Sequence, residues 1–565
     1  MKKLIFAVSL ILFSAIGFNA QAAVVGETQN FYIQSDYDLD GRSEISASLI
    51  KYSPNLYFYI DQEFWHDLDY GKQSEIRRIL DDLAKEFEDK IYPTLTDAFG
   101  SEWKPGIDKD ERTTILFHPM KNGFGGYFNS GDEYLTIQVP NSNQREMIYL
   151  NSQYIDSNNE KAFLAHEFTH LITFNQKERE NNVFEDIWLN EARAEYSSAL
   201  LGYSDLSIGN IFRKRVEDFI ESPNDALCEW ENKEADYGVI NLFIYYLVDH
   251  YGIEILADSL HSEKVGIESI NYALEKNEFE KSFSEVFTDW TIAILVNDCD
   301  FSEEYCYQYE YSKNLQIAPS LNFLAADGKS SLTISSNLKS WEGNWYKFVG
   351  GKGDLELKFI GSKQNTYRIP YLIGDSSGNL SLDFFELDSE NKGNILISSF
   401  GTDIISVTVI PLLQTKTSDF DETETAVPFL LQASTIKKPV ISISFDKQIS
   451  EMTEEELIDR ISELEGILSQ LKSQLQKTTA QKFNQNLYYG MMRNEQVEQL
   501  QEFLKNQGVY PEELITGNFL SLTQKAVISF QEKYADEILI PLGISEGTGF
   551  VGISTRAKIN QLLGY

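Results

Sequence analysis

Two histidines and a glutamate are spaced so that they could act on one metal ion. The segment AFLAHEFTHLITFN places His166 and His170 four residues apart, with Glu167 next to the first. On a helix, positions i and i+4 share one face, so both imidazoles can point at the same ion. Zinc lowers the pKa of a bound water, and Glu167 would accept a proton as that water attacks a carbonyl carbon. The five-residue pattern alone is weak, because histidine pairs on helices are more often structural.

A third ligand is predicted in the segment FEDIWLNEARAEYSSALLGY. A hydrolytic zinc site takes three protein ligands and leaves one position open. Glu191 follows His170 by about one helix and one turn, so a neighbouring helix would return it to the metal. Glu195, four residues further on the same helical face, would accept a hydrogen bond from the distal nitrogen of a ligand histidine. A solvated carboxylate, or a partner for Arg193, is the alternative for Glu195.

The combined pattern HEFTH…WLNEARAEY resembles the gluzincin metallopeptidases. Within that group, residues from about 75 to 255 are similar to the secreted hyicolysin-type neutral metalloproteases, through pieces such as GGYF, AHEFTHLITFN and YGVINLFIYYLVDHYG. No Gly-x-Met-Glu-Asn segment precedes the motif, which favours an endopeptidase over an aminopeptidase. The resemblance implies an α+β zincin-like domain with zinc ligands His166, His170 and Glu191, the general base Glu167, and Glu195 as the residue that orients a ligand.

Two further features concern the substrate. A tetrahedral intermediate needs an oxyanion donor besides the metal. Tyr237, in ADYGVINLF, is the candidate because related zincins use a Tyr or His from a later helix, and His250 is a poorer one. A packed tyrosine at a helix start is the alternative for Tyr237. Residues 133–139, EYLTIQV, alternate in polarity and are expected to form an edge strand that pairs with an extended substrate.

An acidic turn near the N-terminus has the spacing of the first half of a calcium loop. DYDLDGRSE contains Asp36, Asp38 and Asp40, but position twelve would be Ala47, so the bidentate Glu of an EF-hand is missing. Ca²⁺ is therefore the second candidate metal, with a solvated acidic turn as the alternative. The segment GIDKDE at 106–111 has the same ambiguity.

Composition and periodicity predict a multidomain chain of 565 residues. Helices are expected at 73–100, at 239–248 and after Ser157-Asn158-Asn159-Glu160, which has the pattern of a capping box, and a strand at 113–118. Short β-rich runs such as SLTISS, WYKFVG and ISVTVIPLL indicate a sandwich, and leucines at alternating spacings of four and three indicate a coiled coil.

The predicted parts are a signal peptide at 1–22, a zincin-like metallopeptidase domain at 23–318, an all-β sandwich at 319–447, a coiled-coil or helical spacer at 450–480, and a small three-helix module at 485–565.

The C-terminal module resembles peptidoglycan-binding modules through VEQLQEFL, TGNF…AVISFQ and TGFVGISTRAKIN. The resemblance implies cell-wall glycan as a partner, although such modules also serve as generic helical appendages. Phe519 and Phe550 follow two Thr-Gly turns and are expected to fill the core. The helix stripes are expected to comprise Val497, Leu500, Phe503, Leu504, Ala526, Val527, Phe530, Ala557, Ile559 and Leu562.

Charge and targeting signals restrict the location and the partners. The formal charge of −39 excludes nucleic acid as a plausible partner, because phosphate binding needs clustered Lys and Arg. MKKLIFAVSLILFSAIGFNAQA has the features of a secretory signal, and no later stretch is long enough to span a membrane. Cys299 and Cys306 are close enough in sequence to pair, leaving Cys228 free.

These features together predict a secreted bacterial zinc endopeptidase, extracellular or associated with the cell wall, that cleaves proteins. The alternatives are a peptidase of peptidoglycan cross-links and a non-catalytic cell-wall adhesin.

Overall fold

The computed structural model describes residues 24–203, 211–308, 312–326, 329–420, 422–436, 461, 482–492, 494–510, 515–542 and 544–563. They belong to two compact units that divide between residues 439 and 440. The predicted signal peptide at 1–22 lies outside the described residues, as does the predicted spacer at 450–480 apart from Ile461.

A six-stranded mixed sheet begins the first unit. Its order is β1-β2-β3-β4-β6-β5, with β3, β4 and β6 parallel and the other pairs antiparallel. The three parallel strands are buried along their whole length, as expected for strands covered on both faces. The strands are β1 (Thr28–Tyr32), β2 (Glu44–Tyr52), β3 (Leu56–Asp61), β4 (Thr113–His118), β5 (Gly126–Phe128) and β6 (Met147–Asn151).

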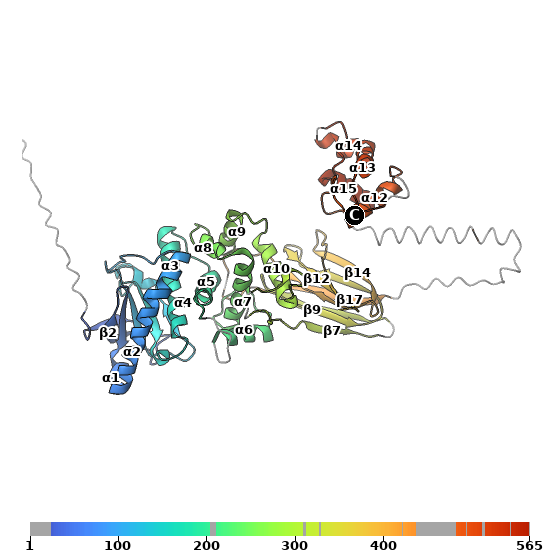
Figure 1. Ribbon diagram of the computed structural model, residues 1–565. Helices are drawn as coiled ribbons and strands as arrows, with labels where there is room; N and C mark the ends of the chain where they lie inside the picture. The colour runs from blue at the N-terminus through green and yellow to red at the C-terminus, as the bar shows by residue number, and fades with distance from the viewer. Residues whose placement is uncertain are drawn as a thin grey trace, which may run out of the picture. The chain divides into compact units, whose positions relative to one another are not determined.

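Helices pack against this sheet and continue beyond it. The amphipathic helix predicted at 73–100 is present as α2, a π-helical turn at Phe87–Ile91, and α3. The helices α4, α5 and α7 lie side by side, with α5 in contact with both others (Figure 1). The α-helices of this unit are α1 (Gln62–Asp67), α2 (Tyr70–Glu86), α3 (Tyr92–Phe99), α4 (Glu160–Thr173), α5 (Ile187–Leu200), α6 (Ile211–Glu221), α7 (Glu234–Tyr251), α8 (Glu254–Leu260), α9 (Gly266–Lys276) and α10 (Phe283–Val296).

The segment 133–139 is not a strand, so that prediction is wrong. A 3₁₀ turn at Ser130–Glu133 is followed by further turns, and Ile137 is 89% exposed. The hydroxyl of Ser142 donates to the carbonyl oxygen of Tyr134 at 2.6 Å, which closes the segment on itself. The edge of β6 is already paired with β5, and β5 is therefore the edge strand.

The predicted capping box before α4 is also wrong. Helix α4 begins at Glu160, and its N-cap residue Asn159 has helical backbone angles and makes no side-chain cap bond. The hydroxyl of Ser157 accepts a hydrogen bond from the Asn159 amide instead of capping the helix. The carboxyl of Glu160 does not turn back toward Ser157, because it is buried.

The predicted β-sandwich is present, and its strands form two leaves. One leaf has the order β13-β12-β15-β9-β7 and the other β14-β10-β17-β8, joined at the single pair Phe400 and Ile404. The strands are β7 (Ser320–Leu324), β8 (Ser331–Leu338), β9 (Tyr346–Gly350), β10 (Gly353–Ile360), β12 (Pro370–Asp375), β13 (Leu380–Phe384), β14 (Lys392–Phe400), β15 (Ile404–Val409) and β17 (Val427–Ile436), with a separate two-stranded pair β11 (Tyr367–Arg368) and β16 (Leu412–Leu413).

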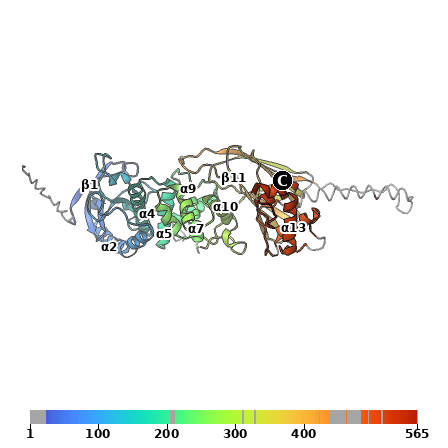
Figure 2. The same ribbon diagram turned by 90° about the horizontal axis from the view of Figure 1, so that it is seen from above.

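The sandwich shares a core with the helical part. Trp341 and Trp345 are buried in the same apolar cluster as the residues of α7 and α10. The indole of Trp345 donates to the carbonyl oxygen of Thr291 at 2.9 Å, and Gln414 donates to that of Ser284 at 3.0 Å. Helix α10 accordingly lies where the helical part meets the strands (Figure 2). The predicted boundary at 318–319 is thus a change of secondary structure inside one compact unit.

The second unit is a small helical module built around α12 (Glu495–Asn506), α13 (Ser521–Lys533) and α15 (Ile553–Leu563), with short turns α14 (Ala535–Ile538) and η7 (Ile540–Leu542). Two buried glutamines hold its Thr-Gly turns in the same way. The side-chain oxygen of Gln501 accepts from the Gly517 amide at 3.1 Å, and that of Gln531 accepts from the Gly549 amide at 2.9 Å. The three-helix prediction is confirmed for this module.

The predicted core of this module is correct for α12 and α13 but not for all of the third helix. Phe519 is buried, whereas Phe550 is 42% exposed. Val551 takes the matching position because it stands two residues after Gly549, as Phe519 stands two after Gly517, and it is fully buried. Ala557 and Leu562 are also exposed, so these two predictions are wrong.

Two other predictions concern cysteines and membrane spans. Cys299 and Cys306 form a disulfide and Cys228 is free and buried. No single helix among the described residues has the length and apolar character of a membrane span. The helices α7 and α8 pass that combined test only as a pair, across a bend of 108°.

Candidate metal centre

Helices α4 and α5 bring three predicted ligands together. His166 and His170 lie one turn apart on α4, and Glu191 lies near the start of the adjacent α5. Nε2 of His166 lies 3.2 Å from Nε2 of His170 and 3.3 Å from Oε2 of Glu191, and Nε2 of His170 lies 3.6 Å from Oε1 of Glu191. In the described part of the chain, no other group of three or more His, Cys, Asp or Glu side chains has its ligand atoms gathered this closely.

The donor set fits a zinc ion. Zinc–nitrogen and zinc–oxygen bonds of about 2.0–2.2 Å in tetrahedral geometry place two ligand atoms about 3.3–3.6 Å apart, close to the three distances found. Both histidines also direct Nδ1 at an oxygen acceptor, so a neutral ring would present the lone pair of Nε2 to the centre. Two imidazole nitrogens and a carboxylate therefore converge, and a divalent cation would satisfy that arrangement.

Glu195 orients His166 as predicted. Its Oε1 lies 3.2 Å from Nδ1 of His166, and the carboxylate is 1% exposed. The sequence analysis missed the two residues that hold this carboxylate: Arg215 donates to Oε1 at 2.6 Å and Asn241 to Oε2 at 2.8 Å. Burial would raise the pKa of Glu195, but the charge of Arg215 and the contact with His166 outweigh it and lower the pKa to about 2. Glu195 is thus an anion, and its alternative pairing with Arg193 is not found.

His170 is oriented by a residue that the sequence analysis also missed. Oδ1 of Asn190 lies 3.1 Å from Nδ1 of His170. Asn190 directly precedes Glu191, so one turn of α5 supplies both a ligand and the residue that orients another ligand. The adjacent Asn190 and Glu191 in WLNEARAEY were the sequence signal that could have identified Asn190 as this residue. Nothing in sequence spacing pointed to Arg215 or Asn241, which come from α6 and α7.

Glu167 has the burial expected of a proton acceptor in a closed site. It is 6% exposed, and burial, with the charges of Glu191 and Glu195, raises its pKa to about 8 in spite of the charge on His166. The edge strand β5 passes close to it, because a Cβ atom added at Gly126 would lie 3.0 Å from Cγ of Glu167. Glu167 therefore lies between the two-histidine face of α4 and the free edge of the sheet.

Tyr237 lies in the first turn of α7, near the same centre. Its ring packs under the guanidinium of Arg215, with Cζ 3.8 Å from the ring centroid, and its hydroxyl donates to Asn232 at 3.3 Å. Burial raises its pKa, as does the charge of Glu191, so the phenol keeps its proton. His250, the poorer candidate, contacts the carbonyl oxygen of Cys306 through Nε2 at 2.9 Å.

The predicted calcium residues do not form a ligand group. Asp38 is fully buried and accepts from Arg42, Nη2 to Oδ1, at 2.8 Å, and the same oxygen lies 3.2 Å from Nδ1 of His118. Because a guanidinium already neutralises this carboxylate, Asp38 is not a free calcium ligand. Asp36 and Asp40 do not join it in any close group of the kind found at the metal centre.

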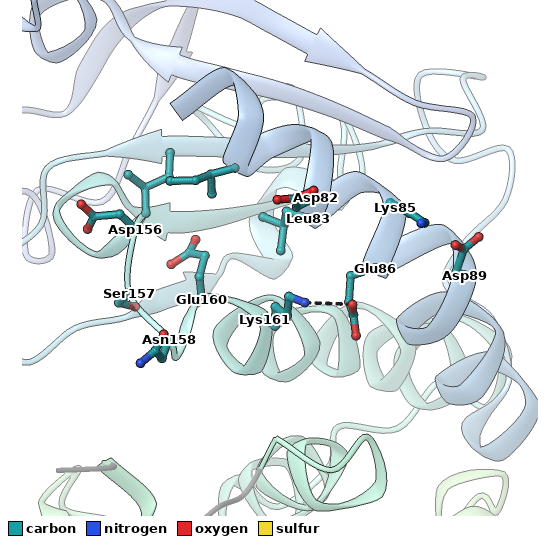
Figure 3. A pocket seen from close by; sticks show the side chains of 12 residues that line it. Asp82, Leu83, Lys85, Glu86, Asp89, Asp156, Ser157, Asn158, Glu160 and Lys161 are labelled. Carbon is teal, nitrogen blue, oxygen red and sulfur yellow. Dashed lines mark hydrogen bonds and ion pairs between the residues drawn. The ribbon is translucent and has the colours of Figure 1, made fainter. Parts of the chain in front are cut away.

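A cavity of the first unit lies away from this centre. It has a volume of about 590 Å³ and lies between α2 and the start of α4 (Figure 3). Lys161 closes one side through an ion pair with Glu86, Nζ to Oε2, at 2.8 Å. Glu160, at its base, is 3% exposed and neither carboxyl oxygen has a hydrogen-bond partner. The cavity contains no residue of the metal centre.

Comparison with known families identifies the C-terminal module. Residues 493–535 match the family described as "Putative peptidoglycan binding domain". The match spans α12, its Thr-Gly turn and α13. The chain therefore carries a domain of this family, as its sequence predicted. A search of the curated proteins finds no match.

Some solved structures resemble parts of the chain. The pre-peptidase C-terminal domain of a Bacillus anthracis collagenase is 9% identical, with 20% of this chain and 96% of that chain covered and a TM-score of 0.15. Aeromonas hydrophila PliG, a periplasmic inhibitor of g-type lysozyme, is 11% identical over 21% of this chain and 98% of its own, with a TM-score of 0.14. These TM-scores are too low to support a conclusion on fold or function.

Proposed function

We propose that this chain is a zinc-dependent endopeptidase that its C-terminal domain holds near the bacterial cell wall. The observation that carries the proposal is the convergence of His166, His170 and Glu191, with Glu167 beside them. The arrangement agrees with the gluzincin pattern to which the sequence is similar. Within it, the two histidines and Glu191 hold zinc, and Glu195 and Asn190 fix the imidazole orientations.

Each residue has a defined task in peptide hydrolysis. Zinc held by the three ligands would act as a Lewis acid on a water molecule and on the substrate carbonyl. Glu167 takes a proton from the attacking water and passes it to the leaving amine. Glu167 directly follows the ligand His166 and is buried, so its carboxylate is placed to accept this proton and return it. Tyr237, which stays protonated, donates a hydrogen bond to the developing oxyanion.

The free edge of β5 is the surface for an extended substrate. Among the described strands β5 pairs with β6 alone, so one row of its backbone groups is open to another strand. A peptide added to that edge would pass beside Glu167, next to which Gly126 lies. Because Gly126 has no Cβ, the edge can approach the carboxylate closely. This edge replaces segment 133–139 as the substrate-binding strand.

The C-terminal domain favours a second candidate substrate. A domain of the peptidoglycan-binding family would concentrate the catalytic unit on cell-wall glycan. Cross-link peptides of the wall would then be presented at high local concentration, by the effective-concentration argument for linked modules. Peptidoglycan cross-link hydrolysis is therefore the alternative activity of the same centre. A non-catalytic adhesin is the third candidate function. The presence of Glu167 disfavours it, because this residue is the proposed general base.

Hydrolysis by matched variants tests the proposal. We would compare the wild type, Glu167→Gln and Glu160→Gln on casein and on purified peptidoglycan, with zinc content measured in each. Glu160→Gln is the control because it removes a buried carboxyl of the same helix away from the metal centre. Casein hydrolysis lost only in Glu167→Gln, with zinc retained, supports the endopeptidase. Release of wall peptides without casein hydrolysis would favour the alternative, and zinc without hydrolysis of either substrate would favour an adhesin.

A further inference from the structure

An exposed pair of aromatic rings lies on the C-terminal module, outside the segment 493–535 that matches its family. Phe550 is 42% exposed and Tyr488 is 53% exposed. Their ring centroids lie 6.5 Å apart, with an angle of 28° between the ring planes. Large apolar side chains that gather on the surface of a small domain are typical of a binding site.

The backbone brings these two rings to the same side of the module. The amide of Val551 donates to the carbonyl oxygen of Leu487 at 2.9 Å, and the amide of Leu487 donates to that of Val551 at 3.3 Å. Both residues are fully buried, and their chain neighbours Phe550 and Tyr488 face outward, because successive side chains alternate on paired extended segments. The Phe550 ring also lies over Gly552, where an added Cβ atom would be 2.9 Å from Cε1 of the ring. The fold of the chain therefore holds the ring in place.

A cavity of about 350 Å³ lies beside Phe550. Phe550 and Ile553, which is 79% exposed, contribute apolar walls, and Asn486, Thr548 and Ser554 add a side-chain amide and two hydroxyls. Sites for small molecules are commonly about 300–1,000 Å³ in volume and combine apolar and aromatic walls with a few polar groups. The cavity has both the size and the composition of such a site.

The two Thr-Gly turns of the module differ at this surface. Buried glutamines hold both turns in the same way. The residue after the turn glycine is Asn518 in the first turn and Phe550 in the second, and Ser521 in the first turn corresponds to Ile553 in the second. The turn therefore folds without an aromatic residue at this position, so packing of the turn does not explain the ring of Phe550.

We propose that Phe550, with Tyr488 and Ile553 beside it, binds a sugar ring of the cell-wall glycan. One face of a pyranose ring presents mainly C–H groups, which pack on an aromatic ring, while the hydroxyl and acetamido groups at its edge can bond to Asn486 and Ser554. The described residues that line the cavity are all uncharged, which suits the glycan better than the stem peptides, whose carboxylates call for cationic donors. The site deepens the wall-holding role proposed above and is independent of the metal centre.

Binding of the full chain to immobilised glycan strands of peptidoglycan, with the stem peptides removed, tests the proposal. We expect Phe550→Ala to weaken binding by about tenfold or more, as the loss of a central aromatic anchor does. Phe550→Tyr keeps the ring and should bind within about twofold of wild type. The matched control is Leu522→Ala, which removes a side chain that is 48% exposed near the first Thr-Gly turn and should bind like wild type. Hydrogen exchange at α12 checks that the module stays folded in each variant.

Three other results would overturn the proposal. Equal affinity of Phe550→Ala and wild type for the glycan strands would remove this site while leaving wall binding intact, and an equal loss in Leu522→Ala would show that the effect is not specific to Phe550. Wild-type binding to whole peptidoglycan but not to the peptide-free strands would identify the stem peptides as the ligand. Because no hydrolysis is measured, these results do not depend on whether the chain proves to be an endopeptidase.

Discussion

Nδ1 of His166 lies 3.2 Å from Oε1 of Glu195, on the far side of the imidazole from the predicted metal position. The same oxygen accepts from Arg215 at 2.6 Å. The carboxylate is therefore held as an anion between a cation and a ligand histidine, which fixes the ring in the tautomer that presents Nε2 to a metal. The affinity of the proposed zinc site would thus depend on residues of α6 and α7 that do not contact the ion.

Glu195→Gln should weaken zinc binding without removing a ligand. The amide oxygen still accepts from His166 but carries no charge, so zinc affinity should fall about 10–100-fold. Competition with a zinc chelator measures this. Glu160→Gln is the control, with an unchanged affinity. An equal zinc affinity in Glu195→Gln and in wild type would show that the carboxylate does not tune the site.

Arg215→Ala should destabilise the first unit. It leaves Glu195 buried at 1% exposure without its cation, and removing one partner of a buried ion pair costs about 3–5 kcal/mol. Chemical denaturation of the apo chain measures the loss in the free energy of unfolding. Arg213→Ala is the control, because Arg213 pairs with Glu217 in an exposed i,i+4 contact. Similar losses in both variants would contradict the prediction.

Gly126→Ala should impair hydrolysis while zinc remains bound. The added Cβ would lie 2.6 Å from the carbonyl oxygen of Tyr149 and 3.0 Å from Cγ of Glu167. The edge strand must then shift away from the base, and we expect kcat/KM to fall by at least about tenfold, since small misplacements of reacting groups are costly. Gly71→Ala, in the first turn of α2, is the control. Full activity of Gly126→Ala would remove β5 from the substrate site.

Glu160→Gln should change how stability depends on pH. Burial raises the pKa of Glu160 well above its ordinary value, and the charge of Asp156 adds to this. Below about pH 4.3 the carboxyl is protonated in both the folded and the unfolded chain, so it contributes nothing. As the pH rises, the unfolded chain loses the proton first, and wild-type stability falls by up to about 1.4 kcal/mol per pH unit. Chemical denaturation at several pH values measures this. Above about pH 4.3, the free energy of unfolding of Glu160→Gln should rise relative to that of the wild type. The same pH dependence in both proteins would contradict the prediction.

Gln531→Ala should loosen the Thr-Gly turn of the C-terminal module. Gln531 is 1% exposed; it accepts from the Gly549 amide and donates to the Phe550 carbonyl oxygen and to Thr555. Loss of these bonds at about 1 kcal/mol each, plus unsatisfied buried groups, predicts a cost of about 2–4 kcal/mol. Hydrogen exchange at residues 545–555 should accelerate in the full chain, and peptidoglycan retention should fall. Exchange at the wild-type rate would show that the glutamine is dispensable.

The sequence predicted the grouping of His166, His170 and Glu191 better than it predicted the surroundings of this group. His166 and His170 follow from helical spacing, because residues four apart on one helix share a face whatever else folds around them, whereas Glu191 was placed by the return of a neighbouring helix. Segment 133–139 shows the limit: its alternation predicted a strand, but the edge of β6 was already paired with β5, and pairing is a property of the whole sheet. The capping-box prediction was wrong for a similar reason. The carboxyl of Glu160 is buried in the folded chain and makes no capping hydrogen bond at the start of α4.

Long-range partners were not predictable from spacing. Arg215 and Asn241 reach Glu195 from helices that begin 16 or more residues later, and no local pattern marks either residue. Phe550 was misplaced because the register of the second Thr-Gly turn puts Val551, not Phe550, at the buried position. The sequence analysis likewise did not predict that the helical part and the sandwich share a core. A buried tryptophan such as Trp341 carries no sequence signal that shows which of the two parts it packs against.

Zinc titration of the metal-free full chain is the decisive measurement of metal binding. We expect one high-affinity zinc site per wild-type chain and its loss in His170→Ala and in Glu191→Ala, with Glu167→Gln still binding one zinc. These residues are the ones whose Nε2 and carboxylate oxygens lie 3.2–3.6 Å apart. A wild-type chain that binds no zinc, or one whose zinc binding survives both ligand substitutions, would contradict the account.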